Sequence, residues 1–154
     1  YRSSRGLGDV YKRQSLGWWC FLMYGLIELF YKFDKYKKNT KAELFNHLIP
    51  ALNSGQYKIL YKDGDIVSYV SWAFFDELAE NHFKQTGHVL NYNCGDRVWL
   101  VDLVSSGDSR RLVKWTNKHF RQSLGSKKKV NYLRMDDNSN IYRISSSLTK
   151  ECYN

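Results

Sequence analysis

Apolar residues dominate positions 16–31, where only Gly17, Gly25 and Glu28 interrupt the run. A helix that crosses a membrane needs about 18 or more such residues with few charges. This run is shorter, contains a carboxylate and has no small-residue cleavage site beside it. The pattern therefore favours a helix buried against the rest of the protein, and no stable membrane span.

From residue 41 onward the pattern changes period several times. Apolar positions recur at helical spacing over residues 41–52, so we expect an amphipathic helix that ends before Gly55. Residues 56–62 alternate with a period of two, and residues 66–73 are rich in β-branched and aromatic side chains. The turn between them, Lys62-Asp63-Gly64-Asp65, predicts that the two strands form a β-hairpin.

The second half of the chain continues the alternation of helices and strands. We expect a helix over residues 74–86, a strand over residues 98–104 and a helix over residues 109–120. A second hairpin is expected from residues 130–135 and 141–144. The order helix, helix, hairpin, helix, strand, helix, hairpin predicts a single α+β domain, in which a mostly antiparallel sheet is flanked by helices.

The composition agrees with one folded domain. The chain has 154 residues, of which 43% are hydrophobic and 16% aromatic, far from the apolar-poor composition of disordered chains. Its three cysteines are odd in number and far apart, and no pair of His or Cys residues has the spacing of metal ligands. We therefore expect no disulfide framework, no metal site and a reducing compartment.

The two ends of the chain are expected to lie outside this domain. Residues 1–14 are rich in Gly, Ser and Arg, show no regular period and resemble translated sequencing-adapter read-through, so we expect a non-native extension. Residues 15–146 are expected to form the domain, and residues 147–154 a polar, frayed tail. The formal net charge is +9, and it stays positive without the opening segment, whose four cations and one carboxylate account for +3.

One residue of the expected strand at 98–104 has unusual chemistry for its place. Asp102 is the only polar residue in an apolar run. An isolated buried carboxylate is costly, so it needs a partner or a shifted pKa. Asp102 is expected to lie at the surface end of the strand, to form a structural ion pair, or to belong to a functional site.

Four motifs follow one another along the chain. They are Ile49-Pro50-Ala51-Leu52 with Gly55-Gln56-Tyr57-Lys58; Ser71-Trp72-Ala73; Cys94-Gly95-Asp96-Arg97-Val98-Trp99; and Val101-Asp102 leading to Gly107. In this order and spacing the chain resembles the RTX toxin-activating lysine acyltransferases, the hemolysin-activating family. The resemblance spans roughly residues 26–146.

This resemblance implies a fold related to the GNAT acetyltransferases and an acyl-transfer reaction. The family takes a fatty acyl group from acyl-acyl carrier protein and places it on internal lysines of a protoxin in the cytoplasm. We therefore expect acyl carrier protein and an RTX-type protoxin as partners, and no bound cofactor. The basic charge is compatible, because acyl carrier proteins are acidic. Residues 106–109 are too short for the Gly-rich phosphate cradle of acetyl-CoA enzymes. The oligomeric state is not determined, and a homodimer stays open.

The resemblance also implies candidate catalytic residues. In the family a His and an Asp form an acid/base pair, with an Asn on the helix between them. Asp102 occupies the Asp position, whereas Tyr36 falls at the His position and His47 at the Asn position. A phenol near its ordinary pKa is a poor base at pH 7, so Tyr36 alone would not replace the imidazole. Either His47 has taken over that role, with Asp102 orienting it, or the protein is an inactive family member that binds carrier protein or toxin without acylating it.

A nucleic-acid binder is the alternative from a different class. The run Lys127-Lys128-Lys129, the cations of residues 109–120 and the aromatic residues would suit phosphates and bases. The aromatic residues, however, mostly fall at core periods and are not interleaved with the cations. We therefore expect no nucleic-acid partner.

Overall fold

A computed structural model describes the backbone of residues 2–150 and the side chains of residues 16–150. Within this part, five strands form one sheet in the order β1-β2-β3-β4-β5. They are β1 (Tyr57–Lys62), β2 (Asp65–Phe75), β3 (Arg97–Ser105), β4 (Lys129–Met135) and β5 (Ile141–Leu148). All neighbours are antiparallel except β3 and β4, which are parallel. The expected mostly antiparallel sheet is therefore confirmed.

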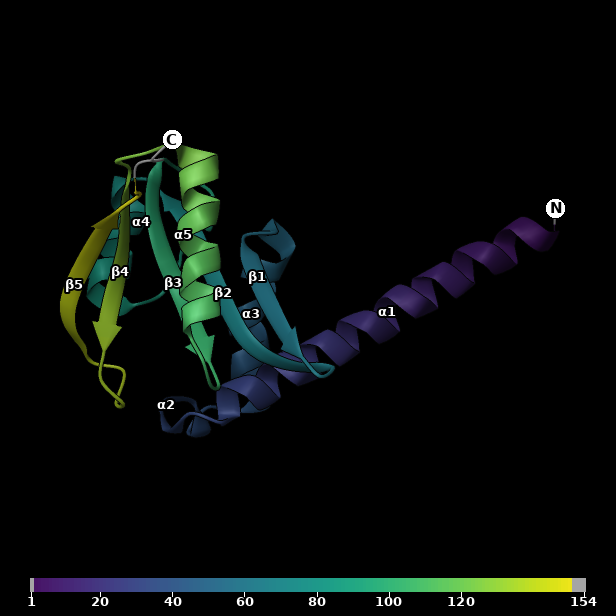
Figure 1. The fold of residues 1–154 in the computed structure, drawn as a ribbon. Coiled ribbons are helices and arrows are strands. Elements are labelled where there is room, and N and C mark those ends of the chain that lie inside the picture. The colour runs from purple at the N-terminus through teal and green to yellow at the C-terminus, as the bar shows by residue number, and fades with distance from the viewer. Residues whose placement is uncertain (1, 151–154) are drawn as a thin grey trace.

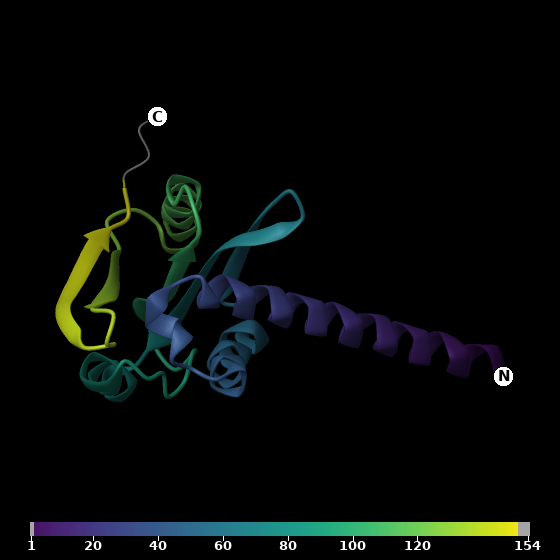
Figure 2. The same cartoon turned by 90° about the horizontal axis from the view of Figure 1, so that it is seen from below.

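Helices cover both faces of this sheet (Figure 1). They are α1 (Arg2–Tyr31), the short α2 (Asp34–Lys37), α3 (Lys41–Ser54), α4 (Glu77–Thr86) and α5 (Arg110–Leu124). Figure 2 shows α5 on one face, and α1 and α3 on the other. The expected order of elements is confirmed, with α2 as an added turn.

Local signals explain where α3 and the first hairpin begin and end. Thr40 caps α3: its hydroxyl accepts a hydrogen bond from the Glu43 amide, and the Glu43 carboxylate accepts one from the Thr40 amide. Gly55 ends the helix in the left-handed conformation, with φ of +70°. In the hairpin turn Asp63 and Gly64 both have positive φ, which suits the twist of the strands on either side.

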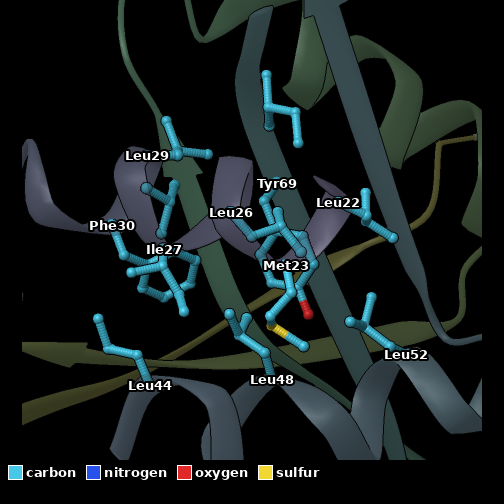
Figure 3. Close-up of a cluster of buried hydrophobic side chains, with 12 residues drawn as sticks. Leu22, Met23, Leu26, Ile27, Leu29, Phe30, Leu44, Leu48, Leu52 and Tyr69 are labelled. Atoms are coloured by element: carbon cyan, nitrogen blue, oxygen red, sulfur yellow. The ribbon is translucent and has the colours of Figure 1, made fainter. Parts of the chain in front are cut away.

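The largest cluster of buried side chains lies between α1, α3 and the sheet (Figure 3). Its members from the two helices are Leu22, Met23, Leu26, Ile27, Leu29, Phe30, Leu44, Leu48 and Leu52. Tyr69 of β2 and Val104 of β3 close the cluster from the sheet side. This packing fixes α3 against the strands that carry Asp102.

The apolar run at residues 16–31 is buried on one side only. The C-terminal part of α1 packs into the core, as expected, but Leu16, Trp18, Phe21 and Tyr24 are exposed. The helix runs on past the edge of the sheet, so its N-terminal part has no strand to cover (Figure 1). Among the described residues, no helix combines the length and apolarity that a membrane crossing requires.

The predicted boundary between the second strand and the following helix was wrong. The helix was expected from residue 74, but β2 continues to Phe75 and α4 begins at Glu77. Asp76 is the reason, because its carboxylate caps the helix by accepting a hydrogen bond from the Ala79 amide at 2.8 Å. In the first turn of α4, Leu78 is 75% exposed.

The predicted polar tail is partly structured. Strand β5 runs to Leu148 because its backbone pairs with β4 as far as Lys129, and Thr149 is buried with its hydroxyl donating to the Gly125 carbonyl at 2.6 Å. An exposed edge strand needs no alternation of apolar residues. The polar sequence of residues 145–147 therefore did not predict that β5 extends this far. Residues 151–154 lie outside the described residues.

At the N-terminal end the backbone is helical from Arg2. Tyr1 and the side chains of residues 2–15 are not described, so a non-native extension there stays a prediction.

Candidate active site

Asp102 owes its orientation to an irregularity in β3. Ser71 of β2 pairs with Asp102, but the next residue, Trp72, pairs with Leu100, so Val101 is an extra residue on β3. Such a bulge interrupts the alternation of side chains between the two faces. Strict alternation from Leu100 would direct Asp102 toward α5; with the bulge, its carboxylate reaches α3 on the opposite face.

His47 meets this carboxylate from α3. It lies one turn from the buried Leu44 and Ala51, at the edge of the buried stripe of the helix. Its Nε2 lies 3.0 Å from Oδ1 and 2.8 Å from Oδ2 of Asp102. The Asp102 side chain is only 6% exposed, whereas that of His47 is 37% exposed. The pair therefore joins a buried carboxylate to an imidazole that solvent and a substrate can reach.

The two groups alter each other's protonation. Burial alone would raise the pKa of Asp102, but the charge and hydrogen bond of His47, together with the Ser71 hydroxyl, hold this pKa below its ordinary value. The Asp102 carboxylate raises the pKa of His47, and this outweighs the opposite effect of burial. Asp102 is thus ionised at neutral pH and stabilises the protonated imidazole.

Ser71 belongs to one of the four motifs that carry the family resemblance, but it was not predicted to be a site residue. Its hydroxyl donates to Oδ2 of Asp102 at 3.1 Å. The sequence could have indicated this role, because Ser71 is a small polar residue on a face of β2 that otherwise carries Tyr69, Ala73 and Phe75. Burial, and then the charge of Asp102, raises the pKa of Tyr69, so this neighbouring phenol keeps its proton.

Tyr36 lies close to the pair without joining it. Its ring packs on Phe30, with centroids 4.7 Å apart, and Phe30 in turn contacts the His47 ring at 6.4 Å. Among the described residues, no hydrogen bond links the Tyr36 hydroxyl to His47 or Asp102. Burial and the charge of Asp102 raise the pKa of Tyr36. Of the three candidate residues, the structure thus brings His47 and Asp102 together and leaves Tyr36 beside them as a protonated phenol.

A cavity of about 580 Å³ reaches Asp102 from the side of β4. The parallel strands β3 and β4 pair only where Val98, Trp99 and Leu100 face Val130, Asn131 and Tyr132. Beyond these pairs the strands diverge, and the cavity fills the space between them. Its walls include Leu103 of β3, Leu133 of β4, and Val113 and Asn117 of α5. The volume falls within the usual range for small-molecule sites, about 300–1,000 Å³.

Lys35 also lines this cavity, and no sequence signal had marked it. Its Nζ lies 3.6 Å from the Met135 sulfur. Burial lowers the pKa of Lys35, while the charge of Asp102 acts in the opposite direction. Among the described residues, no group of three or more His, Cys, Asp or Glu side chains could hold a metal ion.

The start of α5, next to the cavity, is occupied by a carboxylate of the chain itself. Asp108 accepts hydrogen bonds from the Arg110 amide at 3.0 Å and from the Arg110 Nε at 2.9 Å. Helix N-termini attract anions because their amides are unpaired. Here Asp108 supplies that negative charge, so a phosphate at the same place would meet a like charge.

The overall arrangement of this chain is similar to that of a solved GNAT-like domain. Among solved structures, the loading GNATL domain of CurA from Lyngbya majuscula superposes with a TM-score of 0.53 at 18% identity, covering 73% of this chain and 60% of that one. This likeness supports the fold alone and confirms that it is GNAT-like.

Proteins found by sequence similarity share more residues with this chain than that solved structure does. The RTX-II toxin-activating lysine-acyltransferase ApxIIC of Actinobacillus pleuropneumoniae is 30% identical over 112 residues, which cover 70% of each chain. The protein-lysine myristoyltransferase HlyC of Escherichia coli is 29% identical over 115 residues, and the RTX-I toxin-activating lysine-acyltransferase ApxIC of A. pleuropneumoniae is 30% identical over 105 residues. The chain spans 64% of that HlyC and 57% of that ApxIC. The model of the RTX toxin acyltransferase family matches residues 20–147. This match extends from the core helix α1 to the last strand, and it shows that the chain belongs to the RTX toxin acyltransferase family.

Proposed function

We propose that this protein moves a fatty acyl group from acyl-acyl carrier protein to internal lysines of an RTX-type protoxin, in the cytoplasm. The observation that carries the proposal is the hydrogen-bonded pair His47–Asp102, of which Asp102 lines the cavity between β3 and β4. Family membership supports the acyltransferase chemistry. The position of the pair supports His47 as the base, in place of the histidine that the family resemblance locates at residue 36.

Acyl transfer to lysine requires removal of a proton from the ammonium group. Because Nε2 of His47 makes both contacts with Asp102, we assign the ring hydrogen to Nε2. Nδ1 is then the nitrogen that accepts a proton from the acceptor lysine. The imidazolium that forms is stabilised by Asp102, as the raised pKa of His47 indicates.

The bond changes then follow in order. The neutral lysine nitrogen attacks the thioester carbonyl, forming the new C–N bond and a tetrahedral oxyanion. The C–S bond breaks as this oxyanion collapses, and the departing thiolate takes the proton held by His47. The freed imidazole then accepts the second proton from the nitrogen of the new amide and releases it to solvent. The products are an amide on the toxin lysine and the free thiol of the carrier, so neither an oxidant nor a metal is required.

Two features support a carrier-protein thioester over acetyl-CoA as the donor. The cavity opens where β3 and β4 diverge and their backbones no longer pair with each other. An extended thioester arm can lie there, along the backbone of either strand. In addition, Asp108 places a carboxylate at the start of α5, where a nucleotide pyrophosphate would be repelled.

A second candidate function rests on Tyr36. Since its pKa is raised, this phenol cannot act as the base at neutral pH. If His47 does not act instead, the protein is an inactive family member that binds carrier protein or toxin without acylating it.

The test is a transfer assay with the full chain, acyl-acyl carrier protein and an RTX-type protoxin, followed by mass spectrometry of the toxin lysines. Acylated lysines with the carrier-linked donor, and slower transfer from acyl-CoA, support the proposal. Binding of the carrier without transfer supports the inactive candidate. Faster transfer from acyl-CoA than from the carrier-linked donor contradicts the choice of donor.

A further inference from the structure

Helix α5 carries an unbalanced charge. Between residues 110 and 124 it has five cations and no acidic side chain. They are Arg110, Arg111, Lys114, Lys118 and Arg121. Such a one-sided helix attracts an acidic surface, provided that its cations are not already neutralised by the protein itself.

The cations occupy a defined side of the helix. Leu112, Thr116 and Phe120 face the core, and Val113 and Asn117 turn toward the cavity. With 3.6 residues per turn, the next positions around the helix after the cavity side are Arg110, Lys114, Lys118 and Arg121. We call these four residues the basic stripe. The stripe therefore lies beside the part of α5 that lines the cavity.

Two exposed members of the basic stripe have no partner within the described chain. Lys114 and Lys118 are exposed and make no ion pair or hydrogen bond with another described residue. Arg110 pairs with Asp108 across 2.9 Å. The two lysines thus present uncompensated positive charge beside the cavity.

The opposite wall of the cavity is also basic. Arg134 of β4 lines the cavity, and in the register of the hairpin it lies directly opposite Arg143 of β5. Like charges at directly opposed positions repel each other. Cations therefore flank the cavity on both the α5 side and the β4 side.

The aromatic residues of α5 argue against nucleic acid as the partner. Trp115 stacks on His119 at 4.8 Å, and His119 lies 4.7 Å from Trp72 of β2. Lys58 covers the Trp115 ring at 5.4 Å. These rings are occupied by one another and lie on the side of α5 away from the cavity, so they offer no platform on which bases could stack.

We propose that the basic stripe of α5, with Arg134 across the cavity, is the docking surface for the acidic acyl carrier protein. The identity of the partner rests on the proposed function, whereas the location rests on the charges and the cavity. The carrier must sit at the cavity rim because its thioester arm has to reach Asp102 and His47. An acidic carrier that meets the basic stripe first is held where its arm enters between β3 and β4.

The test compares two donors in a pair of matched variants. Lys114→Glu/Lys118→Glu reverses the unpartnered charge of the basic stripe. Lys32→Glu/Lys41→Glu makes the same change in net charge at exposed positions of the α1–α3 side. The donors are acyl-acyl carrier protein and the N-acetylcysteamine thioester of the same fatty acid, which lacks the carrier. Transfer is measured at low and at high ionic strength.

The expected result is selective. For the carrier-linked donor, the stripe variant raises KM about tenfold at low ionic strength with kcat unchanged, and the effect shrinks as salt screens the charges. The small thioester reacts equally with the wild type and the stripe variant, and the control variant matches the wild type with both donors. An unchanged KM in the stripe variant overturns the proposal.

A binding measurement separates this proposal from the proposed function. The anisotropy of a fluorescent acyl carrier protein is titrated with wild type and with both variants, and this needs no turnover. Carrier binding that only the stripe variant loses supports docking even if no acyl group is transferred. Equal binding by all three proteins overturns it. Binding of a single-stranded oligonucleotide that the stripe variant loses, without carrier binding, also overturns it and assigns the stripe to nucleic acid.

Discussion

The Nε2 atom of His47 lies within 3.0 Å of both carboxylate oxygens of Asp102, although 55 positions separate the two residues in the chain. Two local features bring them together: the capped helix α3 carries His47 along the sheet, and the bulge at Val101 directs Asp102 toward it. The arrangement couples a buried negative charge to a reachable imidazole.

Asp102→Asn should reduce acyl transfer by about two to four orders of magnitude, as expected when a general base loses the negative charge that stabilises its protonated form. Asparagine has nearly the same size as aspartate, and its amide oxygen can still accept the hydrogen of His47. The fold is therefore expected to survive, which circular dichroism and the thermal midpoint will show. Wild-type activity in a folded Asp102→Asn protein would rule out the assigned site.

His47→Ala and Tyr36→Phe should have opposite severity. Removing the imidazole removes the proposed base, so transfer is expected to fall by about two to four orders of magnitude, with partial recovery on adding imidazole. Tyr36→Phe removes a hydroxyl that bonds to neither His47 nor Asp102, and is expected to be mild. Steady-state kinetics of the two folded variants measure this. A severe loss in Tyr36→Phe beside a harmless His47→Ala would reverse the two roles.

An exchange of side chains tests whether the imidazole has moved within the site. His47→Asn alone is expected to abolish transfer. Adding Tyr36→His places a histidine where the family resemblance locates one, next to Phe30, and is expected to restore part of the activity. The measurement is the transfer rate of the double variant against that of His47→Asn. No recovery would mean that position 36 in this chain cannot reach the reacting groups.

The pH dependence follows from the raised pKa of His47. The base must be unprotonated, so transfer should rise with pH through a pKa above the ordinary value of about 6.5. In Asp102→Asn the same pKa should fall, because its largest cause is removed. Stability should follow the opposite trend: the pair stabilises the fold fully below the unfolded pKa of His47, and this contribution is lost as pH rises through the folded pKa. NMR titration of the His47 ring in both proteins checks the shift, and an unchanged pKa in the variant would contradict it.

Gly95 should be intolerant of any side chain. A Cβ there would overlap the backbone carbonyl of Phe75 and the amide nitrogen of Asp76, which cannot move without disturbing the start of α4. Gly95→Ala is expected to destabilise the fold by at least about 2 kcal/mol. Gly17→Ala is the control, because no described atom lies within 4 Å of a Cβ at that position in α1 and helix propensity favours alanine. Urea denaturation compares them, and equal stability of the two variants would contradict the packing at Gly95.

Features set by neighbouring residues were predictable from the sequence. The hairpin turn was recognised from Asp63 and Gly64, because few residues adopt positive φ there. The sequence could predict that Asp102 has a polar or charged partner, since a buried carboxylate in an apolar strand needs such a partner. Its identity as His47 depended on the family resemblance, which places His47 at the family's Asn position.

Features set by distant packing were not predictable. The bulge at Val101 leaves no mark in the sequence, since it arises from the pairing of β3 with β2. The divergence of β3 from β4, which creates the cavity, likewise depends on where α5 and β5 pack. Strand β5 lacks apolar alternation because it is an exposed edge of the sheet. The predicted start of α4 was too early because Asp76 caps the helix, so that it begins at Glu77.

The central claim is that His47 and Asp102 form a working catalytic pair. The most direct measurement is a single-turnover transfer from acyl-acyl carrier protein to a protoxin lysine, read by mass spectrometry for the wild type and His47→Ala side by side. The account predicts acylated lysine with the wild type and a rate lower by about two to four orders of magnitude with the variant. Equal rates for the two proteins, or no acylation by a wild type that binds both partners, would contradict it.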